Sequence, residues 1–273
     1  MGLRIDAFGL SDAGCVREVN EDNCLCLDLS KDGVRPDPSF FLLAVADGIG
    51  GHAGGSVASA LAVQTLRENI RPGDGFDPKA RLTDSFLKAN RLIYDQAVRE
   101  PLLAGMGTTM TAAIVEGERI AAANVGDSRL YLLRDGDLSQ VTEDHSWAAE
   151  QRRRSLLSES DIQRSPFRSM ITRSLGYLED VEVDTFALSA GAGDVLMFCT
   201  DGLHGLVPGK KIARILKKHP EPKAACFALI EAAKNAGGDD NITVVVARFE
   251  EIKNGQTIRL SDTVRLPPAR EKC

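Results

Sequence analysis

The stretch that most restricts the fold is Phe40–Gly51, which reads FFLLAVADGIGG. Its first part is a run of apolar residues of strand length, which predicts a buried β-strand at 40–46. This strand runs directly into Asp47-Gly48, a pair that is typical of a turn. A carboxylate beside a glycine with an exposed carbonyl is also a suitable ligand pair for a hard divalent cation. The sequence therefore offers a turn and a cation ligand at the same point.

The same arrangement recurs further along the chain. An apolar run at 195–200 leads into Asp201, and the segment 237–241, which contains Asp240, leads into another apolar run. Each of these aspartates, taken alone, is more easily interpreted as part of a turn than as a metal ligand. Carboxylates at several strand ends can converge in space, however, and Mg²⁺ and Mn²⁺ prefer such oxygen ligands. We therefore treat these aspartates as one candidate metal site.

A turn-rich segment near the N-terminus adds a different group. In Ser11–Asn23, Arg17 lies five residues before Asp22, between two apolar runs. The planar guanidinium of arginine matches the oxygens of a phosphate group. Together with the aspartates, this segment indicates chemistry on phosphate esters.

Periodicity predicts the remaining elements. Strand patterns fall at about 3–9, 23–29, 40–46, 108–115, 119–125, 129–134, 138–142, 181–188, 195–199 and 242–249. Helical patterns fall at about 55–70, 78–99, 144–163, 209–218 and 222–236. Strands in groups with helix pairs between them indicate an α+β fold. Asp135-Gly136 between two strand patterns predicts a hairpin turn.

Composition limits the classes of function. The 273 residues suit one large domain, and a net charge of -6 argues against a protein that binds nucleic acid or anionic lipid. No apolar stretch is long enough to span a bilayer or resembles the core of a signal peptide. The six cysteines form no C-x-x-C pair, as expected of reduced thiols. We expect a cytoplasmic, monomeric protein.

An ordered series of short motifs covers about residues 6–249. The motifs are D-x-G-x-x-R-x-x-N-E-D (Asp12 to Asp22), V-A-D-G-x-G-G (Val45 to Gly51), G-T-T (Gly107 to Thr109), N-V-G-D-S-R (Asn124 to Arg129), E-D-H-S (Glu143 to Ser146), T-R-S-L-G (Thr172 to Gly176), T-D-G-L (Thr200 to Leu203) and D-N-I-T (Asp240 to Thr243). In this order and spacing, the chain resembles the metal-dependent serine/threonine protein phosphatases of type 2C, the PPM family, and in particular its bacterial members.

The resemblance implies a fold and an activity. The expected fold is a central β-sandwich of two antiparallel sheets flanked by helix pairs, an αββα arrangement. Residues 1–250 would form the catalytic domain, and 251–273 would form a polar C-terminal tail. The expected activity is metal-dependent hydrolysis of phosphoserine and phosphothreonine in proteins. Its partners would be phosphorylated proteins, including a Ser/Thr kinase or its substrates.

The resemblance also implies ligands for two Mn²⁺ or Mg²⁺ ions. Asp47 would bridge the two cations, and Gly48 would contribute its carbonyl oxygen. Asp201 and Asp240 would bind the first cation. Two cations about 4 Å apart would activate a water molecule for attack on phosphorus.

Further residues would complete this site. Glu21 and Asp22 would hold metal-bound waters, and Asp127 would join Asp201 at a third metal position. Arg17 would bind the phosphate of the substrate.

The proton donor for the leaving group is less clear from the motifs. Eukaryotic members of the family often carry a histidine directly after Asp-Gly, whereas this chain has Ile49 there and His52 further on. His52 is the candidate general acid, because histidine is the commonest proton donor near neutral pH. A metal-bound water, or a His52 that only orders the glycine-rich turn, is an equally good interpretation.

Two other functions compete with this one. The stretch 48–53 fits the G-x-G-x-x-A pattern of a dinucleotide-binding fold. No second strand pattern lies close enough after it in the sequence to complete a βαβ unit. A catalytically weak relative that binds phosphoproteins is the stronger alternative, because a fold does not specify an activity. The arginine-rich segment 151–173 either recruits acidic substrate or faces solvent.

Overall fold

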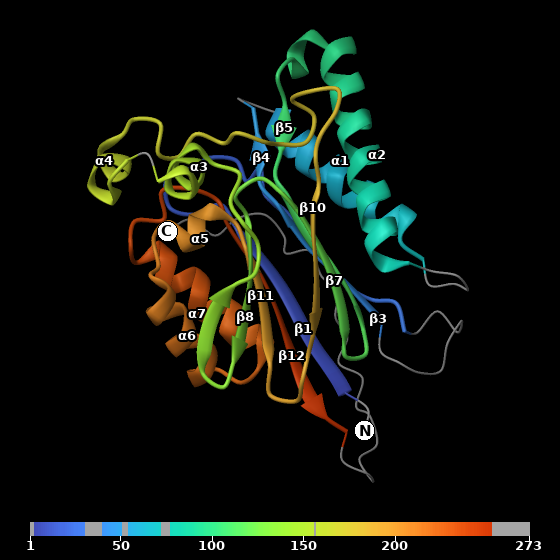
Figure 1. Ribbon diagram of the computed structural model, residues 1–273, viewed down its shortest axis with the longest axis vertical. Coiled ribbons are helices and arrows are strands. Elements are labelled where there is room, and N and C mark those ends of the chain that lie inside the picture. The colour runs from blue at the N-terminus through green and yellow to red at the C-terminus, as the bar shows by residue number, and fades with distance from the viewer. Residues whose placement is uncertain (1–2, 31–39, 51–53, 72–76, 156, 253–273) are drawn as a thin grey trace.

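Two antiparallel sheets packed face to face form the centre of the molecule (Figure 1). This computed structural model describes residues 3–30, 40–50, 54–71, 77–155 and 157–252. The first sheet has the strand order β1 (Leu3–Asp12), β12 (Ile242–Glu251), β11 (Val195–Cys199), β8 (Arg129–Arg134) and β9 (Asp137–Gln140). The second has the order β10 (Asp184–Ser189), β7 (Arg119–Val125), β6 (Met110–Glu116), β3 (Phe40–Ala46) and β2 (Asn23–Asp28).

Helix pairs cover the outer faces of the sandwich (Figure 1). The second sheet is covered by α1 (Gly54–Asn69) and α2 (Pro78–Arg99), and the first by α6 (Gly209–Lys218) and α7 (Pro222–Lys234). The shorter elements are β4 (Gly48–Ile49), which pairs with β5 (Gly107–Thr108), the 3₁₀ turn Pro101–Leu103, α3 (Trp147–Arg154), α4 (Glu159–Arg164) and α5 (Asp201–His204). Every helix in the described ranges is too short or too polar to cross a lipid bilayer.

The strand β3 shows why its sequence is apolar throughout. Phe41, Leu43 and Val45 pack between the two sheets. The alternate residues, such as Leu42 and Ala44, pack beneath α1 and α2. A strand covered on both faces needs apolar side chains at every position instead of the usual alternation. The prediction of an α+β sandwich with flanking helix pairs is confirmed.

Local predictions had mixed outcomes. Asp135 and Gly136 have φ values of 51° and 91° in the turn between β8 and β9, so the predicted hairpin is confirmed. The single helix predicted at 144–163 is wrong, because the structure has α3 and α4 there. Ser155 adopts the left-handed conformation that ends α3, and the hydroxyl of Ser158 caps the start of α4. The helical pattern in the sequence continues across this break, because the segments on both sides of it carry polar residues.

The boundary of the predicted tail falls within the end of β12. This strand continues to Glu251, and residues 253–273 lie outside the described part of the chain. The division into a catalytic domain at 1–250 and a tail at 251–273 therefore stays a prediction.

Candidate metal centre

The strand pairings bring most of the predicted residues to one end of the sandwich. Asp12, at the end of β1, pairs with Ile242 at the start of β12. Cys199, at the end of β11, pairs with Arg129 at the start of β8. In the second sheet, Asn23 at the start of β2 pairs with Ala46 at the end of β3. The residues that flank these strand ends are Asp22, Asp47, Asp127, Asp201 and Asp240.

Asp47 is held by its backbone. Its N–H donates to the hydroxyl of Thr109 at 3.0 Å, and its carbonyl accepts from the Thr108 hydroxyl at 2.8 Å and from the Thr109 N–H at 2.9 Å. The Thr109 hydroxyl also lies 2.8 Å from that of Ser128, which follows Asp127. Side-chain hydroxyls thus fix the backbone of Asp47 and connect it to Ser128, the neighbour of Asp127.

Asn241 ties the N-terminal loop to the start of β12. Its side-chain oxygen accepts from the N–H of Glu21 at 2.8 Å, and its amide nitrogen donates to the carbonyls of Ala13 at 3.1 Å and Val19 at 3.0 Å. These bonds position the loop that carries Arg17, Glu21 and Asp22 against the loop that carries Asp240.

Two glycines allow β4 and α1 to approach closely. A Cβ on Gly48 would lie 2.3 Å from the carbonyl oxygen of Gly55 and 2.5 Å from that of Glu21. A Cβ on Gly55 would lie 2.9 Å from Oε1 of Glu21. Only glycine fits at either position, because real Cβ atoms do not approach so closely. The backbone of Gly48 therefore reaches the site next to Glu21.

The electrostatics of the site are those of crowded carboxylates. Burial, followed by the charges of neighbouring aspartates, raises the pKa of Asp47 well above its ordinary value. Burial is also the main cause that raises the pKa of Asp22 to about 7 and that of Asp127 to about 8. The pKa of Asp201 is raised by burial and then by the charge of Asp240. Each of these groups would be ionised more easily beside a cation.

Some carboxylate oxygens in this cluster lack a protein partner. In the described part of the structure, Oδ1 of Asp22, Asp127 and Asp201 is buried with no hydrogen bond. A buried, unpartnered carboxylate oxygen is costly, and a hard cation relieves that cost. The donors are all oxygen atoms, which suits Mg²⁺ and Mn²⁺. These residues therefore fit the predicted metal ions.

The protein does not provide a closed cage for a cation. Among the residues that the structure describes, no group of three or more His, Cys, Asp or Glu side chains is arranged to hold a metal ion by itself. Mg²⁺ commonly keeps several of its waters and takes few protein ligands, so an open site suits it.

Arg17 lies at the edge of the carboxylate cluster. Its Nη2 is 2.8 Å from Oδ2 of Asp240, and its side chain is half exposed. The guanidinium is therefore next to a predicted metal ligand and also accessible to solvent. This placement brings together the predicted phosphate-binding group and the predicted metal site.

Two histidines support the backbone around Asp127. Nε2 of His204 lies 3.0 Å from the carbonyl oxygen of Asp127, and burial lowers the pKa of this histidine to about 4. It is therefore neutral and donates to that carbonyl. Nδ1 of His145 accepts from the N–H of Gly126 at 3.0 Å, and its Nε2 is 3.1 Å from Asp184. Both histidines therefore have a structural role around Asp127.

The sequence interpretation gave no role to several residues that build the site. Thr109, Thr200 and Asn241 all lie within the quoted motifs, and the Thr200 hydroxyl donates to Oδ2 of Asp22 at 2.9 Å. Their inclusion in those motifs was the available signal. His52, the candidate general acid, lies outside the described residues.

Comparison with known proteins identifies the family. A family model described as Protein phosphatase 2C matches residues 6–242. The chain belongs to the protein phosphatase 2C family. The family predicted from the motifs is thus confirmed.

Individual phosphatases of this family are similar over most of the chain. The serine/threonine protein phosphatase PstP of Mycobacterium tuberculosis is 39% identical over 247 residues, which cover 90% of this chain and 45% of PstP. The chain therefore spans less than half the length of that relative. The serine/threonine phosphatase Stp of Listeria monocytogenes is 36% identical over 250 residues, which cover 90% of this chain and 96% of Stp.

A solved structure is similar in fold and contains metal. The catalytic domain of PstP in complex with two manganese ions matches with a TM-score of 0.78 and 36% identity, covering 91% of this chain and 100% of that domain. The manganese ions belong to the PstP structure. They show that a protein of similar fold in this family binds divalent metal.

Proposed function

We propose that this member of the protein phosphatase 2C family hydrolyses phosphoserine and phosphothreonine in proteins with the help of two Mn²⁺ or Mg²⁺ ions. The observation that carries the proposal is the buried cluster of Asp22, Asp47, Asp127 and Asp201. Their raised pKa values, and the unpartnered oxygens of Asp22, Asp127 and Asp201, are unfavourable in a protein without a cation. The names of PstP and Stp, both serine/threonine phosphatases, support the substrate class.

The residues of the chain would hold the metal ions in the way the family resemblance suggests. Asp47 would bridge the two ions, with the carbonyl of Gly48, Asp201 and Asp240 as further ligands. Divalent cations at such a site activate water as a nucleophile and neutralise charge on phosphoryl oxygens.

The outer residues would order water and substrate. Asp22, whose Oδ2 accepts from Thr200, and Glu21, whose N–H is held by Asn241, would orient water molecules in the site. Arg17 would turn from Asp240 to the substrate phosphate, which its half-exposed side chain allows. Asp127 would supply a third metal position. His52 stays the candidate proton donor.

The alternative function is a weakly active relative that binds phosphoproteins. A binding module would not need several carboxylates buried against one another, so the cluster favours an enzyme. A kinase partner, a monomeric state and a cytoplasmic location also stay predictions.

The Asp240→Asn variant tests the enzyme hypothesis. Hydrolysis of a phosphothreonine peptide should be measured in Mn²⁺ for the wild type and the variant. We expect the variant to be slower by about 10²-fold or more, because a ligand of the metal site is lost. Asp239→Asn is the matched control, since Asp239 is adjacent but exposed, and it should keep the wild-type rate. Equal rates in wild type and Asp240→Asn, or no hydrolysis by either, would contradict the proposal.

A further inference from the structure

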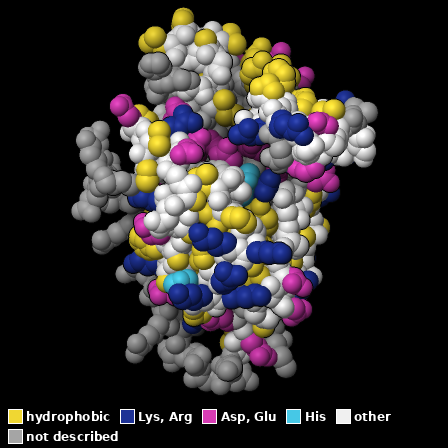
Figure 2. All heavy atoms as spheres, turned by 90° about the vertical axis from the view of Figure 1, so that its left-hand side faces the viewer, with side chains coloured by type: hydrophobic (Ala, Val, Ile, Leu, Met, Phe, Trp, Pro, Cys, Tyr) yellow, Lys and Arg dark blue, Asp and Glu magenta, His cyan; other side chains and the backbone are white. Residues whose placement is uncertain are grey.

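The helix α6 has a uniformly basic outer surface. Its sequence, GKKIARILKK, contains no acidic residue, and Ile212 and Leu216 point into the core. The exposed positions are Lys210, Lys211, Arg214, Lys217 and Lys218. Figure 2 shows Lys and Arg side chains gathered on the lower part of the face that α6 and α7 form, with Asp and Glu side chains grouped higher up. This cationic surface contrasts with a net charge of -6 for the whole chain.

The cations of α6 are not neutralised by the protein. In the structure as described, Lys211, Arg214 and Lys218 take part in no ion pair with a carboxylate. Segment 151–173 contains both kinds of arginine, since Arg154, Arg164 and Arg168 also form no ion pair in the described residues. Arg152 forms an ion pair with Glu159 at 2.7 Å, and Arg173 forms one with Asp184 at 2.8 Å. What distinguishes α6 is that its unpaired cations lie together on a single helix.

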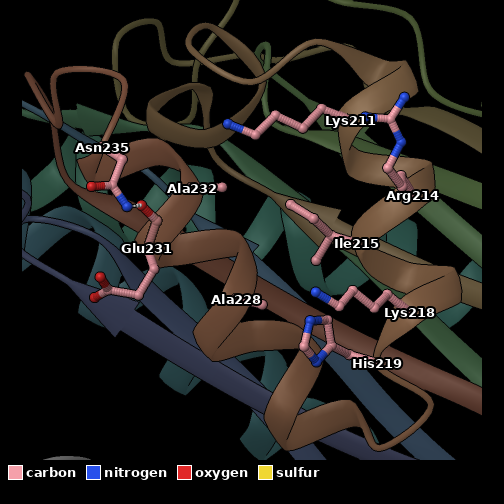
Figure 3. A pocket seen from close by; sticks show the side chains of 9 residues that line it. All are labelled: Lys211, Arg214, Ile215, Lys218, His219, Ala228, Glu231, Ala232 and Asn235. Atoms are coloured by element: carbon pink, nitrogen blue, oxygen red, sulfur yellow. Dashed lines mark hydrogen bonds between the residues drawn. The ribbon is translucent and has the colours of Figure 1, made fainter.

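A groove runs between α6 and α7, with a volume of about 490 Å³. In Figure 3, Lys211, Arg214 and Lys218 project from α6 along one side of this groove. Their spacing of three and four residues places them on one helical face. The apolar part of the groove comes from Ile215 of α6 together with Ala228 and Ala232 of α7. An apolar floor beside a line of cations suits a ligand that has both an apolar group and negative charges.

Two features fix the position of this groove relative to the sandwich. The guanidinium of Arg248, in β12, donates to the carbonyls of Leu216 and His219, the latter at 2.8 Å, and so holds the C-terminal end of α6. Buried residues of α6 and α7 belong to the same core cluster. The groove is therefore part of the fold and does not need to be formed when a ligand binds.

The opposite wall limits the class of ligand. Glu231 and Asn235 line it from α7, and the side chain of Glu231 is exposed. Figure 3 shows the Glu231 side chain directed away from the cations of α6, so the positive charge is confined to one side of the groove, whereas a phosphate-rich polymer or an anionic membrane would extend over Glu231 as well. A short peptide can direct its carboxylates to α6 and place an apolar side chain on the floor between the helices without reaching Glu231. The chain's own segment 253–273 has more Lys and Arg than Asp and Glu, so its charge does not complement α6.

We propose that the groove between α6 and α7 is a docking site for an acidic peptide segment of the phosphoprotein substrate, with an apolar side chain of that segment on Ile215, Ala228 and Ala232. The proposal depends on the proposed function only in assigning the segment to a substrate. Docking of this kind selects among phosphoproteins without contact to the phosphate itself, since the groove lies on the outer helix layer (Figure 1).

Direct binding tests the groove. The probe is a fluorescein-labelled peptide in which one leucine is flanked on each side by two glutamates, measured by fluorescence polarisation with the full chain in Mn²⁺. The test variant is Lys211→Gln, Arg214→Gln, Lys218→Gln. Its Kd for the peptide should rise about tenfold, as expected for three exposed charge pairs. Higher salt should weaken binding to the wild type.

A matched variant controls for net charge. Arg67→Gln, Lys79→Gln and Arg81→Gln remove the same charge from exposed positions on α1 and α2. This variant should keep the wild-type Kd. A second peptide with glycine in place of leucine should bind the wild type more weakly, because it cannot use the apolar floor. Filling that floor with Ala228→Leu should also weaken binding of the leucine peptide.

The outcomes separate this proposal from the proposed function. Hydrolysis of a small aryl phosphate should be the same in all variants, whereas the KM for a phosphothreonine peptide that carries the acidic segment should rise in the α6 variant and in Ala228→Leu but not in the Arg67, Lys79 and Arg81 control. Equal peptide binding by the wild type and the α6 variant would overturn the docking site and leave the phosphatase untouched. Loss of binding to anionic lipid vesicles, or of self-association, with no effect on the peptide would also overturn it. Absence of aryl phosphate hydrolysis would refute the phosphatase instead.

Discussion

The acidic centre and the basic surface of α6 are both clusters of like charge, but they differ in burial. The centre holds aspartates whose pKa values are raised mainly by burial, to about 7 for Asp22. An acid with a raised pKa binds more protons when folded, so it lowers stability as pH rises from 3.8 towards that value. The cations of α6 are exposed and surrounded by water and salt, which screen their repulsion. A buried cluster therefore needs a ligand for stability, whereas an exposed one only offers a surface.

The strongest test of this contrast removes a charge from the buried cluster. Asp47→Asn should slow phosphatase turnover by about 10³-fold, equivalent to about 4 kcal/mol, because the residue proposed to bridge the metals is lost. In EDTA, the same variant should be more stable than wild type by about 1 kcal/mol, since repulsion within the cluster decreases. Urea unfolding in EDTA and a rate assay in Mn²⁺ measure the two effects.

The control for this prediction is Asp84→Asn. Asp84 forms an exposed ion pair with Lys88 at 2.9 Å, remote from the centre in sequence. It should change neither the rate nor the stability appreciably. If Asp47→Asn were as active as this control, the site assignment would be wrong.

Metal binding should stabilise the wild type. At a Mn²⁺ concentration about 100 times the Kd, linkage gives about 2.7 kcal/mol, which corresponds to a rise in Tm of about 5–10 °C for a domain of this size. Asp47→Asn should lose most of this rise. A thermal melt in Mn²⁺ and in EDTA makes the comparison, and an unchanged wild-type Tm would contradict a metal site in the cluster.

A paired charge provides an intermediate case. Burial raises the pKa of Asp194. Hydrogen bonds from Arg134, including one of 2.6 Å from Nη2, lower this pKa by more than burial raises it, so the net shift is downward. Asp194→Asn should therefore destabilise the protein at pH 7, by about 1–3 kcal/mol. Because the folded pKa lies below 3.8, this contribution is complete above that pH and is lost as pH falls through the folded value.

Urea unfolding at pH 7 and pH 3 measures this effect. The difference between the wild type and Asp194→Asn should shrink at the lower pH. Asp137→Asn, at an exposed position in β9, is the control and should show a small difference at both pH values. A difference for Asp194→Asn that did not depend on pH would mean that its ionised form is not what stabilises the fold.

The smallest effect is expected on α6. Lys211→Gln, Arg214→Gln and Lys218→Gln together should change the free energy of unfolding by less than about 0.5 kcal/mol, because these side chains are exposed and have no ion pair in the described structure. Chemical unfolding of the triple variant measures this. A larger loss of stability would show that the cations support the fold and do not form a free surface.

Much of the fold could be predicted because the sequence of a single strand or turn is enough to indicate that element. The apolar run at 40–46 and the Asp-Gly hairpin at 135–136 carry their own signals of burial and positive φ. The candidate site could be proposed because Asp47 and Asp201 follow such strands and Asp240 precedes one. The break between α3 and α4 could not, since Ser155 has to adopt a left-handed conformation that nothing in its side chain requires.

Other features depend on contacts between distant parts of the sequence. The carboxylate of Asp22 receives a hydrogen bond from Thr200, and the backbone of Glu21 is held by Asn241. Periodicity describes one segment at a time and does not report such pairs. The groove between α6 and α7 was missed for the same reason, because its apolar floor uses both helices.

The hydrogen bonds that Asn241 forms with the N-terminal loop also affect when the candidate metal centre can assemble during synthesis. These bonds join the loop after β1 to a residue more than two hundred positions later, and β1 pairs along its whole length with β12. Synthesis proceeds from the N-terminus, so the loop that carries Arg17 and Asp22 must wait for β12 to leave the ribosome. A nascent chain that ends before β12 therefore lacks the contacts that assemble the candidate metal centre.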